Sequence, residues 1–323
     1  MRALDAHALR AALDVHSCVE AMRGVFLEVA SGGFHTPPRS RVRPVGESPN
    51  GMTLMPALRT ATPRRWCLKE MVVTPGNPAR GLDPLQGVAV LHDGDSGRVL
   101  AIADAPQLTT LRTAATTALA TLALARPGAR TVAIIGAGVQ GRSHIQAMRA
   151  MLPGAQLRLW GRTRDKAQAL ASEFGCEAMP SIEAAVRGAD VVCTVTAALD
   201  PILQAGWISP GCHINAVGSS TPAACEIDPA LMAAASLFVD RRDAALAESG
   251  DVLRALAAGA MGEDHIRAEL GDVLRGHHAG RATANEITLY KSLGFGALDL
   301  AALELALSVA DARNLGTVLE WLQ

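Results

Sequence analysis

The glycine-rich stretch 131-TVAIIGAGVQGRSH-144 restricts the fold of this chain more than any other feature. An apolar run typical of a buried strand leads into Gly136, and a helical pattern follows Gly138. Gly136 permits a tight turn, Gly138 lets phosphates approach the backbone, and Gly141 lets the helix pack closely on the strand. The first N–H groups of that helix favour an anion. We therefore expect this turn to hold the pyrophosphate of a dinucleotide, provided that the surrounding elements form a βαβ unit.

The segments that follow this turn alternate between strand-like and helix-like patterns. Such alternation is typical of a parallel, doubly wound sheet. Strands are predicted over 131–136, 155–160, 190–196, 213–218 and 236–240, with helices over 139–152, 163–175 and 181–188.

The chain before this part has a different pattern. A helix is predicted from Asp14, four strand-like runs follow between 51 and 105, and the turn signal 93-DGDSG-97 joins the last two. Long Ala- and Leu-rich helices are predicted over 106–128 and 291–316. The predicted fold class is α/β: a Rossmann-type doubly wound parallel sheet plus an α+β domain with an antiparallel sheet.

The composition excludes several classes of protein. Hydrophobic residues make up 49% and charged residues 19%, so the chain can bury a large core, and a net charge of −1 provides no basic excess for nucleic acid or an anionic membrane surface. No apolar run reaches membrane length, and the N-terminus lacks the apolar region of a signal peptide.

The six cysteines form no C-x-x-C pair. We therefore expect buried free thiols, no metal site and a reducing, cytoplasmic location.

The turn after the second predicted strand bears on the choice of cofactor. An NAD site usually has an acid there for the ribose hydroxyls, whereas this turn reads 161-GRTRDK-166. Arg162, Thr163 and Arg164 suit a 2′-phosphate, which a guanidinium can bind through two hydrogen bonds. The alternative is that these are ordinary solvated charges at the start of a helix. We predict NADPH as the cofactor, with NADH possible.

Several separated stretches together resemble the ornithine cyclodeaminase/μ-crystallin family. An LRTAAT motif followed by GAGxQ and then NAVG is far more specific than the glycine pattern alone. The matching stretches run in order along nearly the whole chain: 53-TLMPA-57, Lys69 in CLKEMV, 94-GDSG-97, 108-LTTLRTAAT-116, 136-GAGVQG-141, 215-NAVGSSTP-222, 270-LGDVLRG-276 and 291-KSLGFG-296.

This resemblance implies a domain organisation, an assembly and a class of chemistry. Residues 1–113, joined by the returning helix 290–323, are expected to form a substrate and dimerisation domain. Residues 114–289 are expected to form the NADP(H)-binding Rossmann domain. The family's members are homodimers that transfer hydride between a nicotinamide cofactor and the α-carbon of an amino or imino acid.

The resemblance also implies a substrate-binding set. In the family an Arg before the LMP motif, a Lys and the Arg of LRTAA surround the substrate carboxylate, which assigns Arg41, Lys69 and Arg112 here. Arg39 and Arg43 are close alternatives to Arg41. Cations that hold the carboxylate would orient the reacting carbon. Lys69 lies in an apolar strand, where an unpaired charge is costly, so we expect it to be functional or ion-paired.

The loop 218-GSST-221 departs from part of the family. Ornithine cyclodeaminases carry an Asp at the position of Ser220, and a serine without an activating partner is a poor base at neutral pH. A serine here resembles the μ-crystallin and bacterial ketimine-reductase branches. Lys69 or a water oriented by Ser220 would hold the proton of the ring nitrogen. We name Lys69 and Ser220 as the catalytic residues.

The cofactor is expected to contact residues from the turns that follow the predicted strands and from the LRTAA motif. The full predicted set is Arg112, Thr113, Gly136, Gly138, Val139, Gln140, Gly141, Arg162, Thr163, Arg164, Thr196, Val217, Ser219 and Leu293.

The favoured function is an NADPH-dependent ketimine reductase. Its substrates would be cyclic imino acids, Δ1-pyrroline-2-carboxylate reduced to L-proline or Δ1-piperideine-2-carboxylate reduced to L-pipecolate. The alternatives are an ornithine cyclodeaminase or alanine-dehydrogenase-like enzyme, and a non-catalytic NADPH-dependent binder of small molecules. We expect a homodimer and no nucleic-acid or membrane partner.

Overall fold

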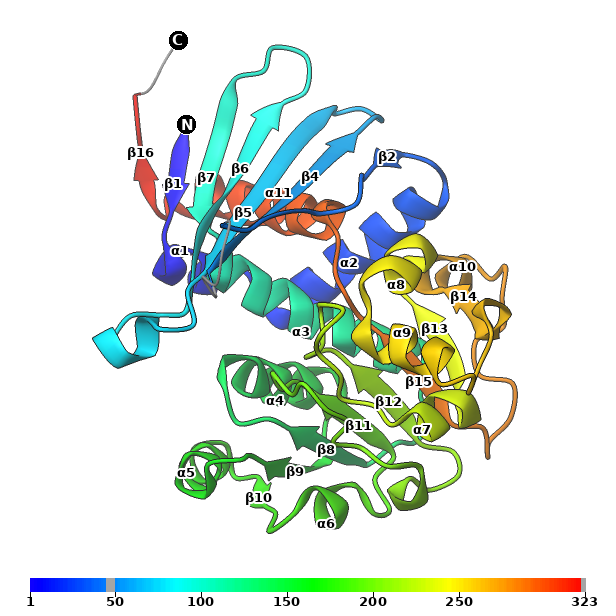
Figure 1. Ribbon diagram of the computed structural model, residues 1–323. Helices are drawn as coiled ribbons and strands as arrows, with labels where there is room; N and C mark the ends of the chain where they lie inside the picture. The colour runs from blue at the N-terminus through cyan, green and yellow to red at the C-terminus, as the bar shows by residue number, and fades with distance from the viewer. Residues whose placement is uncertain (45–49, 321–323) are drawn as a thin grey trace. The chain divides into compact units, whose positions relative to one another are not determined.

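A computed structural model describes residues 1–44 and 50–320 of the chain (Figure 1). The chain divides into two compact units, and each is described by itself. Unit 1 comprises Met1–Thr113 and Gly294–Gln323, and unit 2 comprises Ala114–Leu293. The long helix α3, Ala105–Leu124, contributes residues to both units.

Unit 1 is built on a mixed, mostly antiparallel sheet. The strand order is β16-β1-β7-β6-β5-β4-β2, with β3 paired to β4, and among the described residues of this unit only β1 and β7 run parallel. Four long neighbouring strands form its centre: β4 (Gly51–Arg59), β5 (Arg65–Val73), β6 (Leu85–Asp93) and β7 (Val99–Asp104). The other elements are β1 (Arg2–Leu4), α1 (Ala6–Ala12), α2 (Val15–Ala30), β2 (Phe34–His35), β3 (Ser40–Val42), the 3-10 helix η1 (Asn77–Arg80), α11 (Gly296–Arg313) and β16 (Thr317–Val318).

The alternation of side chains along the central strands gives this sheet two different faces. On one face Met55, Cys67, Lys69 and Leu91 are buried, and helix α11 packs against strands β4 to β6. In Figure 1 helix α11, in orange, runs behind these strands. Asp14 caps α2, as the sequence predicted, by accepting a hydrogen bond from the backbone N–H of Ser17 at 3.0 Å.

Unit 2 contains an all-parallel sheet of eight strands in the order β10-β9-β8-β11-β12-β15-β13-β14. This sheet, together with the mixed sheet of unit 1, confirms the predicted fold class. The strands are β8 (Thr131–Ile135), β9 (Gln156–Trp160), β10 (Glu177–Ala178), β11 (Val191–Thr194), β12 (His213–Ala216), β13 (Ser236–Val239), β14 (Ile266–Glu269) and β15 (Thr288–Lys291). The helices are α4 (Val139–Met151), α5 (Arg164–Phe174), α6 (Ile182–Val186), α7 (Pro229–Ala234), α8 (Arg242–Glu248), α9 (Gly250–Ala257) and α10 (Leu270–Leu274), with the 3-10 helices η2 (Ala205–Trp207) and η3 (Glu263–His265).

The core of unit 2 is an apolar cluster that the parallel strands share with the helices on them. Strand residues such as Ile135, Val192 and Ile214 pack with residues of the connecting helices such as Val186 and Val252. Since both faces of a parallel sheet are covered, its strands are continuous apolar runs rather than alternating ones.

The predicted helix over 291–316 is wrong at its start. Lys291 is the last residue of β15, which pairs with β12 and β13 in the middle of the parallel sheet. Gly294 follows with φ +74°, a left-handed conformation that a right-handed helix cannot contain. Helix α11 therefore begins only at Gly296.

Candidate functional site

Unit 1 holds a buried cluster of charges on the face of the sheet that α11 covers. Lys69 on β5 and Arg112 on α3 both contact Asp299 on α11: Lys69 Nζ lies 2.9 Å and Arg112 Nε 3.0 Å from its carboxylate. Lys69 is 2% exposed, Arg112 4% and Asp299 fully buried. The sequence predicted Lys69 and Arg112, and Asp299 is what brings them together.

The cluster shifts the protonation of its members. Burial lowers the pKa of Lys69 to about 8, although the Asp299 carboxylate opposes this effect. Burial alone would raise the pKa of Asp299, but the Lys69 and Arg112 charges hold it below its usual value. Two cations thus share the one carboxylate of Asp299. Lysine and arginine side chains can also bind the carboxylate of a ligand.

Two arginines from the segment before β4 lie near this cluster. Arg41 pairs with Thr53 in the sheet, which places it on the same face as Lys69. Arg39 donates a hydrogen bond to the carbonyl oxygen of Gly294 at 2.8 Å, and its charge contributes to lowering the pKa of Lys69. Arg39 is therefore a nearby candidate beside Arg41, whereas Arg43 is exposed.

Gly294 fits closely against the Arg112 side chain. A Cβ atom at this position would lie 2.6 Å from Arg112 Nη1, and the backbone is left-handed there. Any other residue would displace the guanidinium. Gly294 of the KSLGFG motif thus packs directly against Arg112, which the family resemblance assigned to the substrate.

The three glycines of unit 2 have the geometry that a dinucleotide cradle requires. Gly136 has φ +130°, and a Cβ there would lie 2.8 Å from the carbonyl oxygen of Val195. A Cβ at Gly141 would lie 1.9 Å from the carbonyl oxygen of Gly136, whereas nothing lies within 4 Å of a Cβ at Gly138. Gly138 is also the N-cap residue of α4, and no side chain there accepts a hydrogen bond from the first N–H groups of the helix. The first and third glycines are thus required by packing, and the second leaves the backbone open to a ligand.

The side chains around this cradle are poorly covered. Val139 is 62% exposed at the first turn of α4, and the buried amide oxygen of Gln140 has no hydrogen-bond partner among the described residues. Arg162, Thr163 and Arg164 are exposed in the turn between β9 and α5. Within the part of the chain that the structure describes, neither arginine forms a salt bridge with a carboxylate.

The remaining predicted residues of unit 2 lie at or beyond the ends of β11, β12 and β15. Thr196 donates both its N–H and its hydroxyl to Glu226 at 2.7 Å. Ser219 is fully buried and its hydroxyl donates to the carbonyl oxygen of Ala224, whereas Ser220 is partly exposed. The structure therefore uses the side chains of Thr196 and Ser219 internally. Val217 and Leu293 are buried, and Thr113, beside Arg112 on α3, is also buried.

Other polar groups have structural partners. His213 contacts Thr288 at 2.9 Å and Asn215 at 3.2 Å, as expected for a core histidine.

All six cysteines are free thiols, and five of them are buried. Among the described residues, no three His, Cys, Asp or Glu side chains are arranged to hold a metal ion, and no helix is both long and apolar enough to span a membrane.

Comparisons with known proteins agree with this architecture. The family model described as "Ornithine cyclodeaminase/mu-crystallin family" matches residues 3–312. The ketimine reductase mu-crystallin of Mus musculus is 40% identical over 291 residues, 89% of each chain. The chain belongs to the ornithine cyclodeaminase/mu-crystallin family.

Two solved structures are similar over essentially the whole chain. The Thermococcus litoralis Δ1-pyrroline-2-carboxylate reductase, in complex with NADH and L-proline, has a TM-score of 0.93 and 28% identity, covering 99% of this chain and 100% of that one. An archaeal alanine dehydrogenase dimer with bound NAD has a TM-score of 0.92 and 26% identity, covering 100% of this chain and 99% of that one.

Proposed function

We propose that this protein is an NADPH-dependent ketimine reductase that transfers hydride to C2 of a cyclic imino acid. The observation that carries the proposal is the buried cluster of Lys69, Arg112 and Asp299. Two cations share one carboxylate there, and cations of this kind bind the carboxylate of a substrate. The ketimine reductase and pyrroline-2-carboxylate reductase among the similar proteins support the same substrate class.

The cluster would bind and orient the substrate. Arg112 and Lys69 hold the carboxylate, which fixes the position of the adjacent C2 atom and turns a bimolecular step into a nearly unimolecular one. Bound NADPH supplies the hydride. Hydride addition to C2 converts the C=N bond to C–N, so the nitrogen must carry a proton. Lys69, with a pKa of about 8, is largely protonated at neutral pH and would donate that proton to the nitrogen, becoming the neutral amine.

Ser220 favours this reaction over cyclodeamination. A protonated cyclic imine is already electrophilic at C2, so its reduction needs no carboxylate base. Oxidation of ornithine does need a base, and the chain has a partly exposed serine where ornithine cyclodeaminases carry an aspartate. Ser220 would orient a water near the ring nitrogen.

We infer NADPH rather than NADH from the turn after β9. Arg162 and Arg164 are exposed, and no carboxylate stands at the tip of the strand to repel a 2′-phosphate. The similar structures hold NADH or NAD, so they support a nicotinamide cofactor in general. The proposed domain roles follow: unit 2 binds the cofactor, and unit 1 binds the substrate.

We further propose a homodimer formed through the second face of the unit 1 sheet. Pro56, Leu68, Val90 and Ile102 stand side by side across β4 to β7 on that face and are only partly buried, and Trp66 is 47% exposed. A contiguous apolar face of this kind favours a protein partner. A second copy of the chain is the occupant that the dimeric relative supports.

A substrate panel tests the proposed function. Purified protein is assayed with NADPH and with NADH against Δ1-pyrroline-2-carboxylate, Δ1-piperideine-2-carboxylate, and pyruvate plus ammonia. It is assayed against ornithine with NADP+ and with NAD+, because that reaction begins with oxidation of the amino acid. Reduction of a cyclic imine with NADPH supports the proposal. Ammonia release from ornithine or NADH-dependent amination of pyruvate would assign one of the family's other activities, and ligand binding without turnover would assign a binder.

A further inference from the structure

Glu226 joins the ends of two neighbouring strands in unit 2. Glu226 is not part of either strand, and its side chain is fully buried. One oxygen accepts the N–H and the hydroxyl of Thr196, which follows β11. The other oxygen accepts the hydroxyl of Thr194 at 2.8 Å and the N–H groups of Gly218 and Ser219 at 2.8 and 3.3 Å. A single carboxylate thus ties the end of β11 to the loop that follows β12.

Gly218 packs closely against this carboxylate, with no space for a side chain of its own. A Cβ atom at Gly218 would lie 2.0 Å from the carbonyl oxygen of Thr196 and 2.5 Å from Glu226 Oε1. Three of the five donors are backbone N–H groups, which can only donate. A glutamine amide at this position would direct an NH2 group at one of those donors and leave a buried N–H unpaired.

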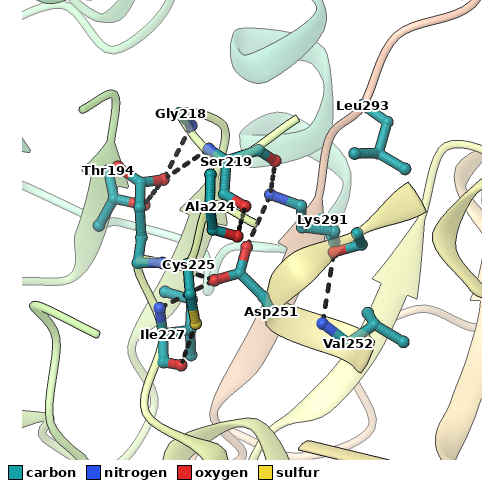
Figure 2. Close-up of polar contacts among 12 residues, drawn as sticks. Thr194, Gly218, Ser219, Ala224, Cys225, Ile227, Asp251, Val252, Lys291 and Leu293 are labelled. Atoms are coloured by element: carbon teal, nitrogen blue, oxygen red, sulfur yellow. Dashed lines mark hydrogen bonds and ion pairs between the residues drawn. The ribbon is translucent and has the colours of Figure 1, made fainter. Parts of the chain in front are cut away.

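A second buried pair supports Glu226 from behind. Asp251 accepts the backbone N–H groups of Glu226 and Ile227 at 2.6 and 3.0 Å, and its carboxylate lies 2.9 Å from Lys291 Nζ. Figure 2 shows Lys291 between Asp251 and Ser219, whose carbonyl oxygen accepts a hydrogen bond from Lys291 at 2.5 Å. Asp251 and Lys291 are both fully buried.

These contacts immobilise Ser219, the residue before Ser220. The N–H of Ser219 donates to Glu226. Its carbonyl oxygen accepts from Lys291, and its hydroxyl donates to the carbonyl oxygen of Ala224 (Figure 2). The proposed function requires Ser220 to keep a fixed place relative to the reacting ring. Ligands of doubly wound sheets bind beyond the carboxyl ends of the strands, which is where this loop lies.

We propose that Glu226, supported by Asp251 and Lys291, is a positioning residue that holds the 218–221 loop, and with it Ser220, for hydride transfer. This inference rests on the proposed reductase function. It differs from a purely structural role because the loop would affect the chemical step in protein that is folded and saturated with NADPH.

The test compares Glu226→Gln with a matched control at the opposite end of the same sheet. Asp190 precedes β11 and accepts the backbone N–H groups of Arg130 and Thr131 at 2.7 and 2.9 Å, beside the start of β8. Like Glu226→Gln, Asp190→Asn removes the charge of a carboxylate that accepts hydrogen bonds from backbone N–H groups. Both variants are expected to lose stability. Only Glu226→Gln should lower kcat of the folded protein at saturating NADPH, by about 10- to 100-fold.

Two milder variants at Thr194 test the inference even if Glu226→Gln does not fold. Thr194→Val removes one hydroxyl donor to Glu226 and should lower kcat in the same direction, whereas Thr194→Ser keeps the hydroxyl and should restore it. An unchanged kcat in folded Glu226→Gln and in Thr194→Val would overturn the inference.

Fluorescence of bound NADPH separates failure of this inference from failure of the proposed function. If the wild type reduces no imino acid, the proposed function fails, and the emission of bound NADPH decides the inference without turnover. A change in that emission in Glu226→Gln but not in Asp190→Asn supports a positioned loop beside the nicotinamide. Emission identical to that of the wild type contradicts it.

Discussion

Lys69 and Asp299 lie 230 positions apart in the sequence, yet Lys69 Nζ is 2.9 Å from the Asp299 carboxylate in a fully buried contact. The same carboxylate binds Arg112. Asp299 therefore contacts both cations, and its charge opposes the lowering of the Lys69 pKa that burial causes.

The charge of Lys69 should be visible in the pH dependence of kcat/KM. The ammonium form is lost as the pH rises through about 8, so kcat/KM of the wild type should fall above that pH. Asp299→Asn removes the charge that opposes the lowering of the Lys69 pKa, so the fall should begin at a lower pH. Glu304→Gln is the control, because Glu304 lies on the same helix but pairs with Arg59 and Arg65. An alkaline limb that stays in place in Asp299→Asn would show that Lys69 does not control it.

Arg112→Ala should weaken the binding of substrate and transition state together. Loss of one partner from a buried charge pair costs about 2–5 kcal/mol, which corresponds to roughly 30- to 4,000-fold in kcat/KM. Steady-state kinetics with the imino acid as the varied substrate measures this effect. Because Arg112 belongs to the cluster proposed to hold the substrate carboxylate, the KM for NADPH should change much less. A loss confined to the KM for NADPH would instead assign Arg112 to the cofactor alone.

The turn after β9 should determine the preference for NADPH. Replacing both Arg162 and Arg164 with Ala should raise the KM for NADPH by roughly 10- to 150-fold for each charged hydrogen bond lost, with little change for NADH. Arg187→Ala is the control, since Arg187 is an exposed arginine of the same unit that pairs with Glu183. Equal effects on the two cofactors would contradict the assignment of these arginines to the 2′-phosphate.

The second face of the unit 1 sheet should be needed for dimerisation. Leu68→Arg places a charge in the middle of the apolar row and should shift the protein from dimer to monomer in light scattering coupled to size-exclusion chromatography. Leu122→Arg alters a 42% exposed leucine on helix α3 and should leave the mass unchanged. A Leu68→Arg protein that remains dimeric would place the interface elsewhere.

The fold could be predicted from the sequence because its signals are local. The glycine turn, the alternation of strands and helices and the 93–97 hairpin each depend on neighbouring residues. The error at residue 291 has the same origin. In the sequence, no clear boundary separates KSLGFG from the Ala- and Leu-rich pattern of α11. The pairing of β15 with β12 and β13 is what shows that Lys291 is in a strand.

The supporting residues of the candidate site could not be predicted in the same way. Asp299 is an acid within an Ala- and Leu-rich helix. A carboxylate buried on such a helix is costly unless it pairs with a cation, so the sequence indicates that a partner is needed. Its partners come from distant strands and helices, so the sequence alone cannot name them. Glu226 has no such signal, because it lies in an irregular segment between two short elements.

The central claim is that NADPH reduces a cyclic ketimine on this protein, and the initial rate of NADPH oxidation with Δ1-pyrroline-2-carboxylate and its six-membered homologue tests it most directly. We predict saturable turnover with at least one of the two, formation of the matching L-amino acid, and loss of that turnover in Lys69→Ala. Folded wild-type protein that binds NADPH but oxidises it with neither imine would contradict the account.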